Sequence, residues 1–596
     1  MSAYVAPLQD IKFVLQELAG LGEVAKLPGY EDATPDLVDA VLEEAGKFAS
    51  GVLAPLNASG DAEGAKWHEG YVVNMPAGFK EAYRQFIEGG WNAVSFEPEF
   101  GGQGLPKLLS AAVQEMWKAS NMAFSLCPLL TQGAIEALLL RGSDEQKRLY
   151  LHKMISGEWT GTMNLTEPQA GSDLSQVRTR AVPEGGHYKI HGQKIFITYG
   201  EHDMVDNIIH LVLARTPDAP PGVKGISLFV VPKYLINADG SRGERNDVRC
   251  VSIEHKLGIH ASPTAVMSYG DQGGAIGTLV GEENRGLEYM FIMMNAARFA
   301  VGLEGVALSE RAYQQAVAYA RDRIQSRDAV HGSSGPVAII KHPDVRRMLM
   351  SMRAQTEATR ALAYVTAAAL DSAHRHPDPA QREQHQAFVD LLIPVVKGWS
   401  TETGIEVATT GIQVHGGMGF IEETGAAQHL RDARITTIYE GTTGIQANDL
   451  IGRKIAREGG QTAKAVIGLI NQTCAELGKQ ANLAEIGKNL GDAVKALAAA
   501  VDFIVANSKT DPGATLAGAV PFLKLMGIVC GGWQMGRAAL AANRHLQAGE
   551  GDKAFYEAKI LTANFYASHF LTQAAGLRDV IVNGGADVMA LPEEAF

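Results

Sequence analysis

The segment Gln413–Gln446, with the sequence QVHGGMGFIEETGAAQHLRDARITTIYEGTTGIQ, carries the most information about fold and function in this chain. It begins with a glycine-rich turn around Gly416 and Gly417, where the absence of side chains leaves room for a phosphate. It ends with a lone carboxylate, Glu440, followed directly by Gly441. Each part alone is common, since glycines form ordinary loops between helices and a glutamate beside a glycine is often a solvated helix end.

The residues before Glu440 are expected to desolvate its carboxylate in part. Ile435, Ile438 and Tyr439 place it in an apolar run. Partial desolvation of a carboxylate raises its pKa toward that of a useful general base. Glu440 is therefore a candidate catalytic base.

The order of these parts resembles the acyl-CoA dehydrogenases, in which an I-Y-E-G-T segment carries the catalytic glutamate. In that family a Q-x-x-G-G turn upstream meets the flavin dinucleotide of the neighbouring subunit. The resemblance implies that Glu440 is the catalytic base and that the chain binds FAD. It assigns cofactor contacts to Gln413, Gly416, Gly417 and Thr442.

A second match is Met163–Asp173, MNLTEPQAGSD, which alone would be read as a tight polar turn. The sequence T-E-P-x-A-G-S-D resembles the flavin-binding segment of the same family. The resemblance implies that Thr166 bonds the flavin and that Ser172 lies near the pyrophosphate or the thioester. Three further residues of the segment are assigned to the cofactor: Met163, Leu165 and Gly171.

A third match is Lys194–Gly200, KIFITYG, after a strand-like pattern. An aromatic residue in a strand is most often part of the core. Here Phe196 stands where the family places an aromatic residue, often Trp, against the isoalloxazine ring. The resemblance also implies that Ile197 contacts the flavin and that Thr198 bonds flavin N5.

Arg323 in YARDRIQSR resembles the arginine that reaches the pyrophosphate bound by the partner of a dimer, and His342 is assigned to the cofactor with it. A solvated helix face is the alternative for Arg323. The match weakens after it, because Ser326 and Arg327 replace the usual Phe-Gly and a loop is inserted before Ile340.

Arg298, in MMNAARFAVG, matches the arginine that the family keeps beside the catalytic carboxylate. A structural ion pair is an equally good reading of this arginine. The resemblance assigns Asn295, Ser172 and Arg298 to the substrate. Some subfamilies place the base one residue before this arginine, where this chain has Ala297, so Glu440 is the only candidate.

The spacing of apolar residues predicts the domain order. Helical spacing dominates to about residue 158, with Thr34–Pro35 as a helix start and Ser143 with Gln146 as a capping box. Strand-like segments at 188–198, 208–214 and 225–231, separated by loops without helical patterns, predict an antiparallel β domain. Long helical segments then return at 287–324, 342–374 and 384–414.

We therefore predict an α+β chain with the fold of the acyl-CoA dehydrogenases. Its parts are an extension (1–33), an N-terminal helical domain (34–158), a middle β domain (159–282), a four-helix bundle domain with Glu440 (283–454) and an extra helical C-terminal domain (455–596). In the extension, five residues are expected to pack a short helix onto a neighbour: Ile11, Phe13, Val14, Leu15 and Leu18.

Composition narrows the function class. The 596 residues carry a net charge of -13, which disfavours nucleic acid and anionic membranes as partners. Four scattered cysteines indicate neither disulfides nor a metal site, and no apolar stretch is judged long enough to span a membrane. The N-terminus lacks the pattern of a secretory signal, so a cytoplasmic protein is expected.

Rival functions lack their sequence features. A serine hydrolase would need a G-x-S-x-G elbow, which the chain does not contain. A flavin-carrying DNA-repair relative would have a basic last domain, whereas residues 455–596 hold 12 Lys and Arg against 13 Asp and Glu.

The resemblance thus implies an FAD-dependent dehydrogenation of an acyl-CoA to a trans-2-enoyl-CoA, as in fatty-acid β-oxidation. It further implies a homodimer that passes electrons to electron-transfer flavoprotein. The chain length and the N-terminal Y-x-A-P-L-x-D segment are similar to a longer bacterial type, which includes 3-(methylthio)propanoyl-CoA dehydrogenases. The acyl chain length stays open.

Overall fold

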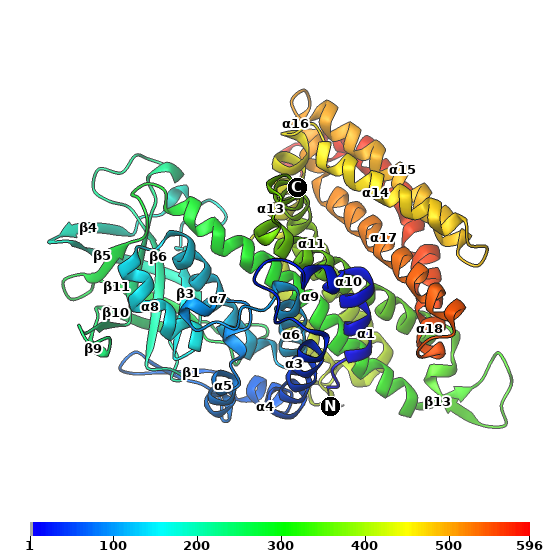
Figure 1. The fold of residues 1–596 in the computed structure, drawn as a ribbon, viewed down its shortest axis with the longest axis horizontal. Helices are drawn as coiled ribbons and strands as arrows, with labels where there is room; N and C mark the ends of the chain where they lie inside the picture. The colour runs from blue at the N-terminus through cyan, green and yellow to red at the C-terminus, as the bar shows by residue number, and fades with distance from the viewer. Residues whose placement is uncertain (1–3) are drawn as a thin grey trace. The chain divides into compact units, whose positions relative to one another are not determined.

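A computed structural model describes residues 4–596, and its elements are labelled in Figure 1. The chain folds into two units. The bundle unit comprises Met1–Gly46, Pro106–Ala119 and Val301–Phe596, and the sheet unit comprises Lys47–Leu105 and Ser120–Ala300.

The sheet unit contains an eight-stranded sheet in the order β10-β11-β5-β12-β7-β6-β3, with β4 paired to β5. Its strands are β3 (Trp159–Asn164), β4 (Arg180–Glu184), β5 (His187–Thr198), β6 (Asn207–Ala214), β7 (Ser227–Pro232), β10 (Val248–Ile253), β11 (Thr264–Tyr269) and β12 (Ala275–Leu279). The three predicted strand segments are β5, β6 and β7, so the middle β domain is confirmed.

One pair in this sheet differs from the expected antiparallel pattern. β3 runs parallel to β6, with Trp159 opposite Asn207, whereas all other neighbours are antiparallel. The connection between them contains β4 and β5, and parallel neighbours require a long connection of this kind. β6 is buried along its whole length and its sequence NIIHLVLA is nearly continuous in apolar residues, as in strands covered on both faces.

The sheet unit also contains the helices α4 (Pro55–Glu63), α5 (Phe79–Glu88), α7 (Met122–Arg141) and α8 (Asp144–Ser156). Of these, α7 and α8 pack on β3. The predicted capping box of α8 is confirmed: Ser143 Oγ accepts from Gln146 N at 3.2 Å, and Gln146 Oε1 accepts from Ser143 N at 3.0 Å.

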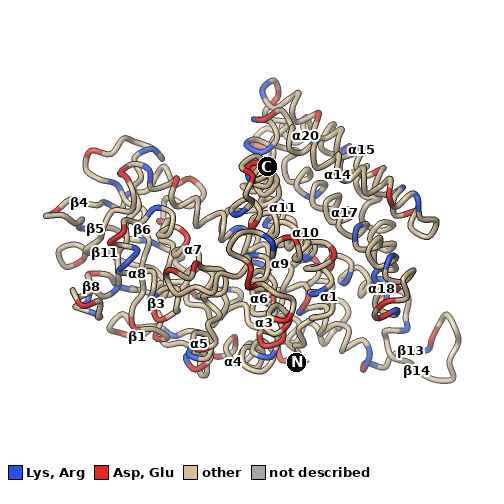
Figure 2. The backbone as a smooth tube through the Cα atoms, viewed as in Figure 1, with Lys and Arg blue, Asp and Glu red and all other residues tan. Residues whose placement is uncertain are grey.

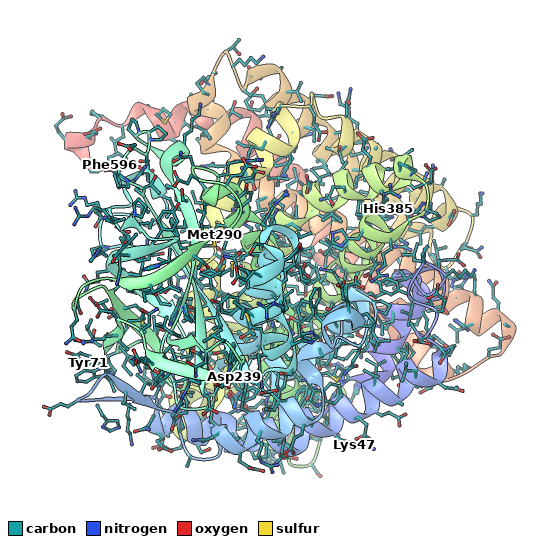
Figure 3. All side chains as sticks on the ribbon, turned by 60° about the vertical axis from the view of Figure 1, so that its left-hand side comes forward. Lys47, Tyr71, Asp239, Met290, His385 and Phe596 are labelled. Atoms are coloured by element: carbon teal, nitrogen blue, oxygen red, sulfur yellow. The ribbon has the colours of Figure 1, made fainter. Side chains whose placement is uncertain are left out.

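Two small hairpins complete the sheet unit: β1 (Lys66–His68) with β2 (Val72–Asn74), and β8 (Tyr234–Ile236) with β9 (Arg242–Arg245). Their turns carry Tyr71 and Asp239, which are labelled in Figure 3 among the side chains of this unit. Both turns lie at the surface of the unit.

Long helices form the centre of the bundle unit. They are α6 (Lys107–Ser120), α9 (Gly286–Asp322), which begins in the sheet unit, α10 (Pro343–Arg375) and α11 (Pro379–His415). These confirm the helical segments predicted near 287–324, 342–374 and 384–414. The insertion between α9 and α10 forms a hairpin of β13 (Ile324–Arg327) and β14 (Pro336–Ala338).

The C-terminal region is helical, as predicted, and packs directly on the bundle within the same unit. At Gly527, an added Cβ would lie 2.2 Å from the Trp399 side chain of α11, so the two helices can approach closely only with glycine there. The helices are α14 (Gln461–Gly478), α15 (Ala484–Asn507), α16 (Pro512–Ala517), α17 (Ala519–Ala548), α18 (Lys553–His569), α19 (Ala574–Asn583) and α20 (Gly585–Ala590). Charges of both signs are interspersed along them (Figure 2).

The N-terminal extension packs as predicted, since Ile11, Phe13, Val14, Leu15 and Leu18 are all buried. They belong to α1 (Leu8–Phe13) and the helical turn that follows it. The Phe13 ring lies 5.6 Å from that of Phe555 on α18. The extension therefore joins the C-terminal region.

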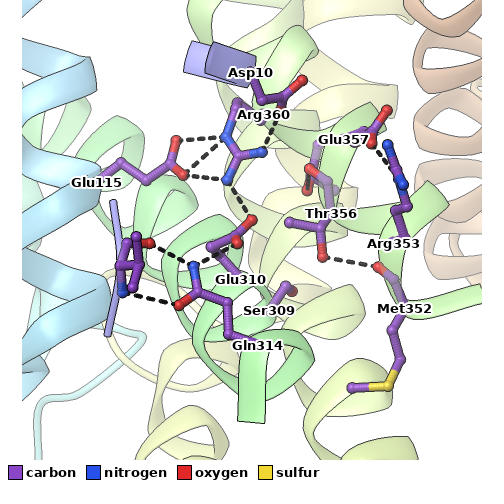
Figure 4. Close-up of polar contacts among 12 residues, drawn as sticks. Asp10, Glu115, Ser309, Glu310, Gln314, Met352, Arg353, Thr356, Glu357 and Arg360 are labelled. Carbon is purple, nitrogen blue, oxygen red and sulfur yellow. Dashed lines mark hydrogen bonds and ion pairs between the residues drawn. The ribbon is translucent and has the colours of Figure 1, made fainter. Parts of the chain in front are cut away.

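A buried ion cluster fixes this junction (Figure 4). The fully buried Arg360 of α10 contacts Glu115 at 2.6 Å, Glu310 at 2.7 Å and Asp10 at 2.5 Å. Lys559 of α18 contacts the same Asp10. Paired carboxylates on every side offset the cost of burying the guanidinium.

Within residues 4–596, two helices reach the length and hydropathy of a membrane span, contrary to the expectation from the sequence. They are α7 and α9, and 78% and 67% of their most apolar windows are buried inside the protein. That share of burial is what the core helices of globular proteins show.

Candidate active site

Glu440 lies in a short turn of the bundle unit, between the 3₁₀ turn η10 (Arg434–Thr437) and α13 (Thr443–Asp449). Its φ of 54° is left-handed, and that of Gly441 is 86°. A residue with a side chain is strained in this region, and such strain persists only where the surroundings hold it.

The surroundings hold this turn by its carbonyl groups. The buried Gln446 donates from Nε2 to Glu440 O at 3.0 Å and to Gly441 O at 3.3 Å. Lys397 of α11 donates from Nζ to Gly441 O at 2.6 Å. An added Cβ at position 441 would lie 2.7 Å from Gln446 Nε2, so this position requires glycine for space as well as for its φ.

The predicted apolar enclosure of Glu440 is only partial. Ile438 is 48% exposed, and Ile435 and Glu440 are half-buried. Tyr439 is also half-buried, but its hydroxyl donates to Glu304 Oε2, which is fully buried. Thr442, predicted to contact the cofactor, caps α13 by accepting from Ile445 N at 3.2 Å.

Glu304 of α9 was missed by sequence reasoning. It has no exposed surface, and burial raises its pKa to about 7, although Lys118, Tyr439 and Lys397 favour its charged form and Glu440 opposes it. Its signal in the sequence was a single carboxylate in the apolar helical run AVGLEGVAL.

The glycine-rich turn lies at the end of α11. Gln413, Gly416 and Gly417 are exposed, Gly416 has a φ of 60°, and an added Cβ at either glycine would meet no atom within 4 Å. This surface is open, as a phosphate site requires. Arg323 is exposed just after α9, and His342 bonds Gln325 O at 2.7 Å from Nε2.

In the sheet unit, the segment MNLTEPQAGSD leaves β3 and is tied to β5 by a buried ion pair. Glu167 accepts from Lys194 Nζ at 2.8 Å, from Thr179 Oγ1 at 2.6 Å and from Arg178 N at 2.7 Å. Lys194 also donates to Leu165 O at 3.0 Å, so it holds both arms of the turn. Both residues lie within the motifs read from the sequence, but their pairing was not predicted.

Thr166 is placed beside β5 by a main-chain bond, since Ile195 N donates to Thr166 O at 2.9 Å. Phe196, which follows Ile195 on β5, has a φ of 59° and is 57% exposed. Phe196 is therefore not core, which was the alternative reading. The hydroxyls of Thr166 and Thr198 bond no side chain or main chain in the described residues.

An exposed aromatic ring with free hydroxyls on the same strand and the adjoining turn fits a flat ligand with a polar edge, such as a flavin. Gly171 and Ser172 are also exposed, and Gly171 has no atom within 4 Å of an added Cβ. Met163 is buried on β3, Leu165 is half-buried and Ile197 is buried. Of the predicted substrate residues on α9, Asn295 is exposed and Arg298 is buried.

A cavity of about 360 Å³ lies elsewhere in the bundle unit, between α11 and the C-terminal helices. Trp399, Leu523, Tyr566 and Phe570 line it, and no predicted site residue does. Among residues 4–596, no group of three or more His, Cys, Asp and Glu is arranged to hold a metal ion.

Four family models match the chain in order. They are the acyl-CoA dehydrogenase N-terminal domain at residues 37–158, the middle domain at 162–271, the C-terminal domain at 284–455 and an acetyl-CoA dehydrogenase C-terminal-like domain at 466–592. The site residues named above stay predictions.

Similar proteins extend over the whole chain. A 3-methylmercaptopropionyl-CoA dehydrogenase of Ruegeria pomeroyi is 53% identical, covering 98% of this chain and 99% of its own. A butyryl-CoA dehydrogenase of Syntrophomonas wolfei is 35% identical over 100% of this chain and 99% of its own. The solved structure of Caenorhabditis elegans ACDH-11 shares the fold, with a TM-score of 0.76 at 19% identity over 98% of this chain and 97% of its own.

The ordered domains and the full-length similarity show what kind of enzyme this is. Because every domain of the family is present together with the C-terminal extension, the chain belongs to the acyl-CoA dehydrogenases, FAD-dependent oxidoreductases that act on the CH–CH bond of acyl-CoA thioesters.

Proposed function

We propose that this acyl-CoA dehydrogenase oxidises 3-(methylthio)propanoyl-CoA to its trans-2-enoyl thioester. The observation that carries the proposal is the 53% identity, over nearly the full length of both chains, to a protein named for this substrate. The butyryl-CoA dehydrogenase is less similar, at 35%. General fatty-acyl-CoA oxidation, which the sequence favoured, is the second candidate.

Glu440 would take the α-proton of the substrate as general base. A bound FAD would supply the acceptor for the hydride of the β-carbon. The Glu440 turn is suited to this role because Gln446 and Lys397 hold its carbonyls, which fixes the backbone that carries the carboxylate. The main-chain NH of Glu440 would donate to the thioester oxygen as enolate charge develops there.

The residues that would hold FAD fall into two sets. Thr166, Thr198 and Ser172 would bond it, and Phe196 would lie against its ring system. Arg323, Gln413, Gly416 and Gly417 would serve the cofactor of a second subunit, so a homodimer is proposed. Sedimentation monitored at flavin absorbance tests this, and a monomer that keeps FAD tightly bound would rule it out.

Electron-transfer flavoprotein is the proposed acceptor, and the cytoplasm the proposed location. Anaerobic mixing of the substrate-reduced enzyme with purified electron-transfer flavoprotein would test the acceptor, because electron transfer reduces the acceptor's flavin and its fluorescence is lost. Reoxidation of the enzyme at an unchanged rate upon its addition would exclude it.

The substrate is tested by mixing the enzyme anaerobically with a panel of thioesters and following the loss of flavin absorbance. Pentanoyl-CoA is the matched control, because it has a methylene in place of the sulfur. Butyryl-CoA is one chain atom shorter, and octanoyl-CoA is longer. One methylene in an apolar pocket is worth about 10–200-fold in kcat/KM.

We expect 3-(methylthio)propanoyl-CoA to exceed butyryl-CoA and octanoyl-CoA by about 10-fold or more in kcat/KM. Octanoyl-CoA as the best substrate would establish the general fatty-acyl function instead. No reduction by any thioester would overturn the proposed reaction itself.

A further inference from the structure

A second carboxylate lies behind the candidate base in the bundle unit, and the proposed reaction does not use it. Glu304 is fully buried on α9, and its Oε2 accepts the hydroxyl of Tyr439, the residue directly before Glu440. Its other oxygen, Oε1, has no hydrogen-bond partner in the described residues. A buried oxygen without a partner is costly, so this group is not explained by stability.

We propose that Glu304 is a positioning residue for the dehydrogenation: through Tyr439 it fixes the strained Glu440 turn, and its charge sets the pH range in which Glu440 acts as the base. The inference rests on the proposed function only in that the reaction starts with proton abstraction by Glu440.

The positioning part follows from the geometry. Glu440 has a φ of 54°, which a glutamate adopts only when its neighbours are held. Gln446 and Lys397 hold the chain at and after Glu440 by its carbonyls. Tyr439 holds the chain before it, because its hydroxyl donates to Glu304 Oε2. Loss of that bond would leave the chain before Glu440 held by main-chain bonds, such as Tyr439 N to Ile435 O at 3.2 Å.

The electrostatic part follows from the charges that face Glu304. Lys118 comes from α6 and is buried, and Lys397 comes from α11 and is buried. Glu440 comes from the turn itself, and Asp432 of α12 (Ala426–Ala433) acts on the intervening Tyr439. The group therefore contains two lysines and the two carboxylates of Glu304 and Glu440. The carboxylate of Asp432 acts on Tyr439.

In such a group the two carboxylates oppose each other's ionisation. When Glu304 is charged, the charged form of Glu440 is disfavoured and Glu440 is a stronger base. The free Oε1 of Glu304 can carry a proton without breaking the bond from Tyr439. Burial lowers the pKa of Lys118 to about 8, and attraction to Glu304 opposes that shift. Glu304 and Lys118 can therefore change charge near neutral pH.

The test compares Glu304→Gln and Tyr439→Phe in the full-length holoenzyme. Glu304→Gln keeps an acceptor for Tyr439 and removes the charge, whereas Tyr439→Phe removes the bond and keeps the charge. Glu288→Gln, an exposed charge at the start of the same helix, is the control. The rate of flavin reduction is measured anaerobically from pH 5.5 to 9 with whichever thioester reduces the wild type fastest.

We expect the acid limb of the rate profile, its low-pH side, to move down by about one pH unit in Glu304→Gln, which corresponds to a like-charge interaction of about 1.4 kcal/mol. Tyr439→Phe should slow reduction about 10-fold at every pH without moving the limb, because positioning alone is lost. Binding of a 3-thia acyl-CoA and the FAD content should be unchanged in both variants.

A Glu304→Gln profile that superimposes on the wild type, or that falls equally at every pH together with the melting temperature, would overturn the proposal. If Glu304→Gln does not fold, Lys118→Met takes its place and should move the limb upward, since it removes a positive charge from the group. An unmoved limb in that variant would equally refute the inference. Absence of reduction in the wild type would instead refute the proposed function.

Discussion

Replacing Asp10 by Asn should loosen the N-terminal extension by an amount that the structure sets. Asp10 contacts Arg360 at 2.5 Å and also Lys559, and its side chain is only 13% exposed. Burial alone would raise its pKa, but attraction to Lys559 and Arg360 outweighs this and lowers the pKa to about 2.

The difference from the ordinary value of 3.8 is almost two pH units, worth about 2.5 kcal/mol at neutral pH. Because the pKa of the folded state is the lower one, this stabilisation is present above about pH 4 and is lost as the pH falls toward 2. The two proteins should therefore differ by a constant amount between pH 5 and 8, and by about half as much near pH 3.

Hydrogen exchange of the α1 amides measures this locally, which avoids assuming that a chain of this size unfolds in one step. At pH 7 we expect about 60-fold faster exchange in Asp10→Asn, which corresponds to the same free energy. Asp36→Asn, an exposed carboxylate near the same segment, is the matched control. Unchanged α1 protection, or a difference that widens on acidification, would refute the reasoning.

Three further substitutions test the site. Glu440→Gln should slow flavin reduction by about 10²–10⁴-fold while FAD content and binding of a 3-thia acyl-CoA persist, and reduction near the wild-type rate would show that Glu440 is not the base. Lys194→Met should weaken FAD binding about 10-fold or more in equilibrium titration, because Glu167 loses the cation that ties its turn to β5; unchanged affinity would contradict this. Gly441→Ala should cost about 1–3 kcal/mol of stability and lower the reduction rate, since its Cβ would meet Gln446, and a variant as stable and active as the wild type would contradict the strained turn.

The secondary structure was largely predictable because it depends on local periodicity. The apolar spacing at 287–324 and 384–414 gave α9 and α11 to within a few residues, and the β-branched run at 208–214 gave β6. The parallel pairing of β3 with β6 was not predictable in this way, since it depends on which strands the fold brings together and not on the sequence of either strand.

Site residues can be predicted from the sequence where they form a contiguous motif, but not where two residues distant in the sequence form a pair. IYEGT and TEPQAGSD are each read along the chain. Glu304 and Tyr439 are 135 residues apart, and Arg360 and Asp10 are 350 apart. Nothing local marks such partners, because a buried charge is stabilised by whatever the fold brings beside it.

The contact between Asp10 and Lys559 has a consequence for how the protein is made. The two residues are 549 positions apart, so Asp10 leaves the ribosome long before its partner is synthesised. At about 5–20 residues per second, Asp10 waits roughly half a minute to two minutes for Lys559. A message truncated before α18 would yield a chain that can never complete this cluster, so the junction distinguishes finished molecules from unfinished ones.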